Sequence, residues 1–291
     1  MSFGKPFPPP SSLPEGWRQG FAWDKHGAVA ASAWPDAKAL VAHGAALGVL
    51  QAVMTGLQQW LAGEPAVPVD LRSLHDADRA LVTQVLGDGE VVAQCVPDPA
   101  SADDVSMQAQ ETAFAGVWRV RHVQHSQCVL DTIELGDFPQ AMAQSACDGA
   151  HPMSPQPTVW PAGTANAPAV LQELHERAQR WAQALAAGGP RPAHHVTNLT
   201  LQPLSPTDRR VLDEHLGQGS IQVLSRGHGN CRVSPTKTAH VWRVTYFNAR
   251  DMVILDTFEV GGVPEVACAA RQDLQDSAHR LSDLLQWVEL A

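Results

Sequence analysis

The hydrophobic residues of this chain recur at helical spacing in two long segments. The first covers roughly residues 36–61 and the second residues 167–187, and in both the apolar positions fall three or four residues apart. This spacing predicts two amphipathic helices that each bury one face. The first segment is interrupted by His43, Gln51 and Gln58, so we expect it to be too polar to span a membrane.

Each long helix is followed by a shorter helical pattern and then by strand-like segments. The shorter helices read HDADRALVTQVL from residue 75 and SPTDRRVLDEHL from residue 205. Ser205 and Pro206 form a typical helix start, because serine caps the first N–H groups and proline fits the first turn. Residues 116–123 and 252–260 are rich in β-branched and aromatic side chains, which favours strands.

The order of these elements repeats along the chain, and so do many of the residues. The sequence VWRV at 117–120 recurs at 241–244, and LDTIELGDFP at 130–139 recurs as LDTFEVGGVP at 255–264. A repeat of this length indicates an internal duplication. Seven further positions match without gaps: Leu71, Leu74, Asp78, Arg79, Leu86, Gly87 and Gly89 with Leu201, Leu204, Asp208, Arg209, Leu216, Gly217 and Gly219.

The pattern therefore predicts an α+β protein made of two internally repeated modules. Each module is expected to combine helices with a three-stranded antiparallel meander, and a pseudo-twofold axis is expected to relate the two. The expected divisions are a Pro-rich N-terminal tail (1–33), repeat module 1 (34–150), a linker (151–166) and repeat module 2 (167–291).

Composition and charge narrow the class of protein. The hydrophobic fraction of 44% is typical of a globular chain. The formal net charge of −10, with only 20 scattered basic residues, argues against nucleic acid or an anionic membrane as partner. The five cysteines show no CxxC pair, so we expect no disulfide framework, and a reduced, cytoplasmic location. The N-terminus lacks the apolar segment of a signal peptide.

Two aspartates lie inside apolar strand patterns, one in each repeat. Asp131 and Asp256 both stand in the sequence LDT, and a buried carboxylate must be paired or hydrogen-bonded. Arg119 and Arg243, in the repeated VWRV, are their expected cross-strand partners. We interpret the four residues as two structural ion pairs, with a catalytic acid as the alternative.

The stretch SRGHGNC, residues 225–231, carries the most chemically suggestive residues of the chain. Cys231 with His228 or His240 could form a thiol nucleophile and its base, which would need a third group to orient the histidine. A metal or iron–sulfur delivery site could use Cys231 with His122, His125 and Cys128, but no four-ligand pattern is visible. A phosphate loop would need a helix directly after the glycines, whereas a strand pattern follows here.

The simpler interpretation is a glycine-rich turn on a sheet that contacts a partner protein. The first repeat has no matching histidine or cysteine there, so preserved chemistry is disfavoured. Loops on a rigid scaffold commonly carry binding. Trp118 and Trp242 are expected either in the cores or at an interface. The partner-binding residues expected from the sequence are Ser225, Arg226, Gly227, His228, Gly229, Asn230, Cys231, Arg232, Glu111, Trp118 and Trp242. No catalytic residue, metal ligand or cofactor is assigned.

These motifs resemble a known family. Residues 224–270 closely resemble the C-terminal domain of hydrogenase expression/formation proteins of the HupH/HyaF/HoxQ type. The first repeat resembles the same domain through LGDGEV, QETAFAGVWRV and LDTIELGDFP, so the likeness covers roughly residues 70–290.

The resemblance implies a non-enzymatic, cytoplasmic accessory protein of an uptake [NiFe] hydrogenase. Its expected partner is the precursor of the iron–sulfur small subunit, held together with a second small maturation chaperone until assembly and export. It implies no nucleic acid and no membrane insertion. The alternative from the residues is a thiol- or metal-dependent enzyme, or a metal or iron–sulfur delivery factor, that uses Cys231 and a nearby histidine.

Overall fold

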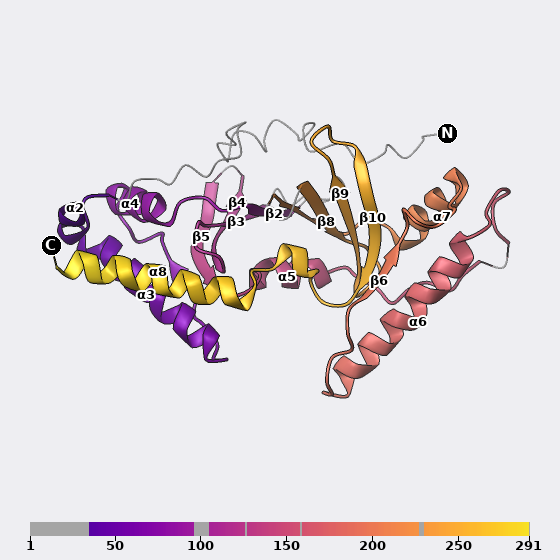
Figure 1. The fold of residues 1–291 in the computed structure, drawn as a ribbon, viewed down its shortest axis with the longest axis horizontal. Coiled ribbons are helices and arrows are strands. Elements are labelled where there is room, and N and C mark those ends of the chain that lie inside the picture. The colour runs from indigo at the N-terminus through magenta and orange to yellow at the C-terminus, as the bar shows by residue number, and fades with distance from the viewer. Residues whose placement is uncertain (1–34, 96–104, 126, 158, 227–229, 291) are drawn as a thin grey trace. The chain divides into compact units, whose positions relative to one another are not determined.

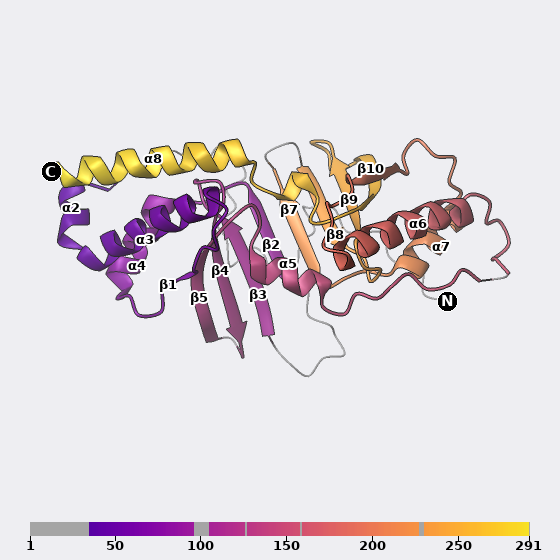
Figure 2. The same cartoon turned by 90° about the horizontal axis from the view of Figure 1, so that it is seen from below.

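A computed structural model describes residues 35–95, 105–125, 127–157, 159–226 and 230–290 of this α+β protein. The chain divides into two compact units (Figures 1 and 2). The unit that we call the first contains the described parts of residues 29–146, 220–227 and 265–291. The second unit contains the described parts of residues 147–219 and 228–264.

The first unit has a helical layer and a six-stranded antiparallel arrangement. Its strands follow the order β1-β5-β4-β3-β2-β7. Its helices are α2 (Ala37–Ala42), α3 (Gly44–Leu61), α4 (Asp76–Leu86), α5 (Gln140–Cys147) and α8 (Arg271–Glu289), with a short 3-10 turn η2 (Glu265–Ala267). Its strands are β1 (Val69–Asp70), β2 (Val91–Cys95), β3 (Val105–Glu111), β4 (Val117–Gln124), β5 (Gln127–Leu135) and β7 (Ile221–Ser225).

The second unit is smaller and has two helices on four strands. Its strands follow the order β8-β9-β10-β6, and each strand pairs with its neighbour in antiparallel orientation. The helices are α6 (Ala167–Ala186) and α7 (Pro206–Leu216), and the strands are β6 (His195–Asn198), β8 (Asn230–Pro235), β9 (Val241–Phe247) and β10 (Val253–Val260).

Each repeat contains a run of four consecutive strands, β2–β5 and β7–β10, where the sequence pattern predicted a three-stranded meander. In the first repeat this run begins with β2, whose residues Val91, Val92 and Ala93 are buried. This strand pairs with β3 on one side and with β7 on the other. Periodicity alone cannot assign so short an apolar run to a buried strand or to a buried helix.

The long N-terminal helix expected over 36–61 is divided at His43. This residue leaves the helical region, with φ −110° and ψ 65°, so α2 ends before it and α3 begins after it. The imidazole Nδ1 of His43 lies 2.9 Å from Oδ1 of Asp78 on α4, which holds the break in place. A tertiary contact of this kind is not visible in helical periodicity.

The core of the first unit is built largely from α3 and the C-terminal helix α8, which lie along each other (Figures 1 and 2). Leu50, Val53 and Leu57 of α3 are buried in the same cluster as Leu274 and Leu281 of α8. Each fully buried leucine contributes about 2 kcal/mol of transfer free energy. The last helix of repeat 2 thus packs in the unit of repeat 1, so the compact units cut across the repeat boundaries.

The core of the second unit lies between α6, α7 and the sheet. Leu171 and Leu174 of α6 pack with Leu212 of α7 and with Phe258 and Val260 of β10. These α6 positions are three residues apart, as the sequence pattern predicted.

The start of α7 confirms the capping pattern expected at Ser205. The Ser205 side chain accepts the N–H of Asp208, and the Asp208 carboxylate accepts the N–H of Ser205, which completes a capping box. Asp208 also binds the start of α6, because its Oδ1 accepts the N–H groups of Ala165, Asn166 and Ala167 at 2.8–2.9 Å. One buried carboxylate therefore serves two helix starts.

Candidate functional site

The two ion pairs expected from the sequence are both formed. Arg119 contacts Asp131 in bidentate geometry, with Nε–Oδ1 at 2.9 Å and Nη2–Oδ2 at 2.7 Å. Arg243 and Asp256 repeat this geometry at 3.0 and 2.8 Å. Both carboxylates are buried. Bidentate charge-assisted hydrogen bonds satisfy a buried carboxylate, which fits a structural role for both pairs.

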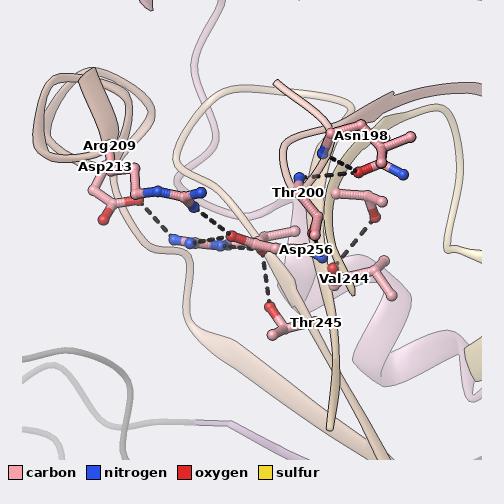
Figure 3. A network of polar contacts seen from close by, with 10 residues as sticks. Asn198, Thr200, Arg209, Asp213, Val244, Thr245 and Asp256 are labelled. Carbon is pink, nitrogen blue, oxygen red and sulfur yellow. Dashed lines mark hydrogen bonds and ion pairs between the residues drawn. The ribbon is translucent and has the colours of Figure 1, made fainter. Parts of the chain in front are cut away.

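Additional polar contacts extend the pair in the second unit (Figure 3). Arg243 Nη1 lies 2.6 Å from Asp213 Oδ1 on α7, and Arg209 Nη1 lies 3.6 Å from Asp256 Oδ2. Thr245 Oγ1 donates to Asp256 Oδ1 at 3.2 Å, and Thr200 Oγ1 accepts the Asp256 N–H. The network joins α7 to β9 and β10.

The charges of this network stabilise one another. Burial works against the charge on Arg243, but the hydrogen bonds and charges of Asp256 and Asp213 outweigh it and raise its pKa. In the first unit, Arg119 Nη1 instead donates to the neutral hydroxyl of Thr83 at 2.9 Å. At the corresponding helix position, the first unit thus has the hydroxyl of Thr83 and the second unit has the carboxylate of Asp213.

The stretch SRGHGNC is only partly described. Gly227, His228 and Gly229 lie outside the described residues. Ser225 ends β7, and Asn230 begins β8. The side chain of Arg226 is exposed, and its backbone N–H donates to the carbonyl of Glu90 at 3.1 Å.

Most of the other side chains expected to bind a partner are buried, which corrects their assignment as surface anchors. Trp118 is fully buried, donates from Nε1 to the Gly136 carbonyl at 3.1 Å and packs edge-on against Phe138. It therefore belongs to the core, where a large aromatic ring contributes most to packing. The residues of this set that are buried are Ser225, Cys231, Arg232, Glu111, Trp118 and Trp242, and Asn230 is half-buried.

Glu111 is buried at the end of β3. Burial raises the pKa of this carboxyl group to about 7, and the negative charges of Glu90 and Asp273 add to the rise. The N–H of Gly116, which donates to Oε1 at 3.3 Å, lowers the pKa but does not outweigh the burial. The carboxyl group therefore titrates near neutral pH inside the first unit.

Among the residues that the structure describes, the metal alternative gains no geometric support. Cys231 is buried in β8, opposite Tyr246 of β9. Burial also lowers the pKa of His240. Cys128 is exposed, with its Sγ 3.2 Å from the carbonyl of Leu130. Within the described ranges, no three His, Cys, Asp or Glu side chains are grouped so that they could hold a metal ion.

An exposed apolar surface lies where β10 begins, and the sequence analysis missed it. Met252, Val253 and Ile254 are 63%, 55% and 55% exposed, and we call these three residues the β10 tip. The aligned residues in the first repeat are Gln127, Cys128 and Val129. Comparing MVIL in the second repeat with QCVL in the first could have revealed this more apolar surface from the sequence. Three consecutive exposed apolar side chains are typical of an interaction surface.

The segment before the short helix differs between the two repeats. Leu199, not Leu201, takes the place of Leu71, because the N–H groups of Leu71 and Leu199 donate to the carbonyls of the equivalent Asp131 and Asp256, and both leucines are buried. The gapless alignment of Leu71 with Leu201 is therefore wrong, and repeat 2 has two extra residues between this leucine and Leu204. Leu201 lies in this longer segment and is 82% exposed.

Across the helices that the structure describes, none combines the length and apolar character that crossing a membrane requires.

Comparison with known proteins identifies relatives over most of the chain. The family model of the HupH hydrogenase expression protein, C-terminal conserved region, matches residues 44–154 and 164–288. The chain is 41% identical over 246 residues to the hydrogenase expression/formation protein HoxQ of Cupriavidus necator, covering 84% of this chain and 81% of that protein. It is 39% identical to HupH of Rhodobacter capsulatus, with coverages of 84% and 81%.

Two more distant likenesses are found as well. The hydrogenase-1 operon protein HyaF of Escherichia coli is 33% identical over 223 residues, which cover 76% of this chain and 73% of HyaF. A solved structure of the hydrogenase expression protein HupH from Thiobacillus denitrificans is 27% identical, with a TM-score of 0.36, covering 43% of this chain and 98% of that one. On the family match and the identities above 30%, the chain belongs to the hydrogenase expression/formation family of the HupH, HoxQ and HyaF type.

Proposed function

We propose that this protein is a non-enzymatic maturation chaperone of an uptake [NiFe] hydrogenase. It holds the immature iron–sulfur small subunit in the cytoplasm, together with a second small chaperone, before assembly and export. The observation that carries the proposal is membership of the hydrogenase expression/formation family over most of the chain. The family names supply a maturation role, and the choice of client is our proposal.

The β10 tip is the surface on which we propose that the client binds. A chaperone must cover apolar surface of an unassembled subunit and still release it, which calls for a moderate interface with a few apolar anchors. Met252 and Ile254 offer exposed apolar side chains, and Leu201 is a further exposed apolar residue in the same unit. Arg226, the exposed arginine of the stretch SRGHGNC, remains a proposed contact with the client.

The internal duplication supports a further part of the proposal. We infer that the two repeats derive from one ancestral module and are related by a pseudo-twofold axis. The register of β2 and β7 supports this, since Ala93 lies opposite Val223, its own repeat equivalent, with symmetric pairs on either side. A duplicated scaffold frees one copy to change its surface, as the longer segment of repeat 2 that carries the exposed Leu201 illustrates.

The test is co-purification from cells that express the tagged protein and the hydrogenase structural genes. The wild-type protein should bring down the small-subunit precursor, identified by mass spectrometry. Ile254→Asp should reduce the recovered precursor at least about five-fold, because a buried interfacial charge costs more than 1 kcal/mol. Val129→Asp is the matched control at the aligned position of the first repeat, where the exposed valine should tolerate a charge.

Two outcomes would contradict the proposal in different ways. If wild type recovers no hydrogenase subunit, the chaperone function is wrong. If wild type recovers the precursor and Ile254→Asp recovers as much, the function stands but the β10 tip is not the client surface. Circular dichroism of both variants shows whether they are folded.

A further inference from the structure

A small hollow lies on one face of the sheet in the second unit. It is lined by Arg232 and Ser234 of β8 and by Arg243 and Thr245 of β9. Arg232 lies opposite Thr245 and Ser234 opposite Arg243, so the four residues form a square on one sheet face. The hollow has room for a particle about the size of a water molecule.

Ser234 is the polar group that the fold leaves unsatisfied here. Its side chain is 4% exposed, and its Oγ has no hydrogen-bond partner among the residues that the structure describes. A buried hydroxyl without a partner costs about 1–3 kcal/mol. Thr245 Oγ1, by contrast, already donates its hydrogen to Asp256. The Ser234 O–H is therefore the donor available to an occupant of the hollow.

Two of the four side chains that line the hollow are arginines. Arg243 is held in place by Asp256 and Asp213, through Nε, Nη2 and Nη1. Arg232 is buried, and its guanidinium lies over the ring of Phe247, 5.5 Å from the centroid. Burial lowers the pKa of Arg232, and so does the charge of Arg243, as expected for two cations that share a poorly solvated site.

The first repeat fills the equivalent space with its own side chain. Gln110 pairs across the strands with Arg119, as Ser234 pairs with Arg243. The Gln110 amide donates to the carbonyls of Gly89, Val91 and Glu111, so its position is closed and neutral. The second repeat has the shorter Ser234 at this position. Beside it, Gln108 and Arg121 of the first repeat correspond to Arg232 and Thr245, so one arginine stands on the other strand.

We propose that this hollow binds a small monovalent anion, either a halide or the end of a carboxylate group. The Ser234 hydroxyl donates a hydrogen bond to it, and the guanidinium groups of Arg232 and Arg243 supply the charge. A larger oxyanion such as phosphate does not fit the available space. The assignment is independent of the proposed chaperone function.

The test measures the melting temperature of the full chain at constant ionic strength in sodium salts of bromide, acetate and a bulky sulfonate. Bromide or acetate at ten times its dissociation constant should raise the melting temperature by roughly 3 °C over the sulfonate. If only bromide raises the melting temperature, the occupant of the hollow is an inorganic ion. If acetate raises it as well, the occupant is the carboxylate of a bound chain.

Variants locate the effect. Ser234→Ala should abolish the anion-dependent shift even if it alters the melting temperature itself. Gln110→Ala, at the matching position of the first repeat, is the control that should retain the shift. Crystals soaked in bromide should show an anomalous peak between Ser234 and Arg232. Equal melting temperatures in all three salts, or only a water molecule at that position, would overturn the assignment.

Discussion

Asp208 joins the starts of two helices in the second unit, so its removal should destabilise that unit strongly. Its Oδ1 accepts three backbone N–H groups at the start of α6, and its Oδ2 accepts the N–H and hydroxyl of Ser205 at the start of α7. A single helix cap contributes about 1–2 kcal/mol. Because this carboxylate serves two helix starts, Asp208→Ala should lower the free energy of unfolding by about 3 kcal/mol.

Urea denaturation followed by tryptophan fluorescence measures this loss. Trp181 lies on α6 in the same core, edge-on to His194 at 5.3 Å between ring centroids, so its emission reports on this unit. The control is Asp78→Ala at the matching position of the first repeat. Asp78 holds His43 through one contact of 2.9 Å, so its loss should cost only about 1 kcal/mol. A loss below about 1 kcal/mol for Asp208→Ala would refute the reasoning.

The same variant predicts a pH dependence. Burial alone would raise the pKa of Asp208, but hydrogen bonds from the N–H groups of Ala167, Ala165 and Ser205 outweigh it and hold the pKa well below its usual range. A depressed folded pKa stabilises the protein above the unfolded pKa of about 3.9, and this contribution is lost as pH falls further. The stability gap between wild type and Asp208→Ala should thus be constant from pH 5 to 7 and shrink below pH 4.

Three further outcomes are expected. Asp256→Asn leaves Arg243 buried with a weaker partner and should lower the free energy of unfolding by about 3 kcal/mol in the same urea assay. A loss under about 1 kcal/mol would argue against a structural role for this ion pair. The raised pKa of Glu111 means that the folded protein loses stability as pH rises from about 4.5 through 7. The free energy of unfolding of Glu111→Gln should therefore rise by up to about 3 kcal/mol relative to wild type between pH 5 and pH 8. No such rise would contradict the burial of this carboxyl group. Cys231→Ser should leave hydrogenase maturation and client co-purification unchanged, and loss of both with a folded variant would revive the thiol alternative.

Local signals made part of the fold predictable from the sequence. The Ser205-Pro206 start, the helical spacing of α6 and the pairing of Arg243 with Asp256 each depend on residues close in sequence or on adjacent strands. The requirement that a buried carboxylate finds a partner is strong enough to predict that pair without a structure.

Tertiary contacts decided what the sequence could not show. The packing of α8 in the unit of the first repeat depends on which helix offers a complementary apolar face, and every amphipathic helix of the chain offers one. Likewise the gapless match of Leu71 with Leu201 was wrong, because the structure places the buried Leu199 at the position of Leu71 and leaves Leu201 exposed. Candidate surface residues chosen by chemical character, such as Trp118, proved to be core residues for the same reason.

The most direct test of the central claim is an affinity pull-down of the tagged wild-type protein from cells that express the complete hydrogenase gene set, with mass spectrometry of the recovered chains. The account predicts enrichment of the small-subunit precursor, still carrying its export signal, and of a second small maturation protein. Recovery of neither hydrogenase subunit nor any maturation factor would contradict it.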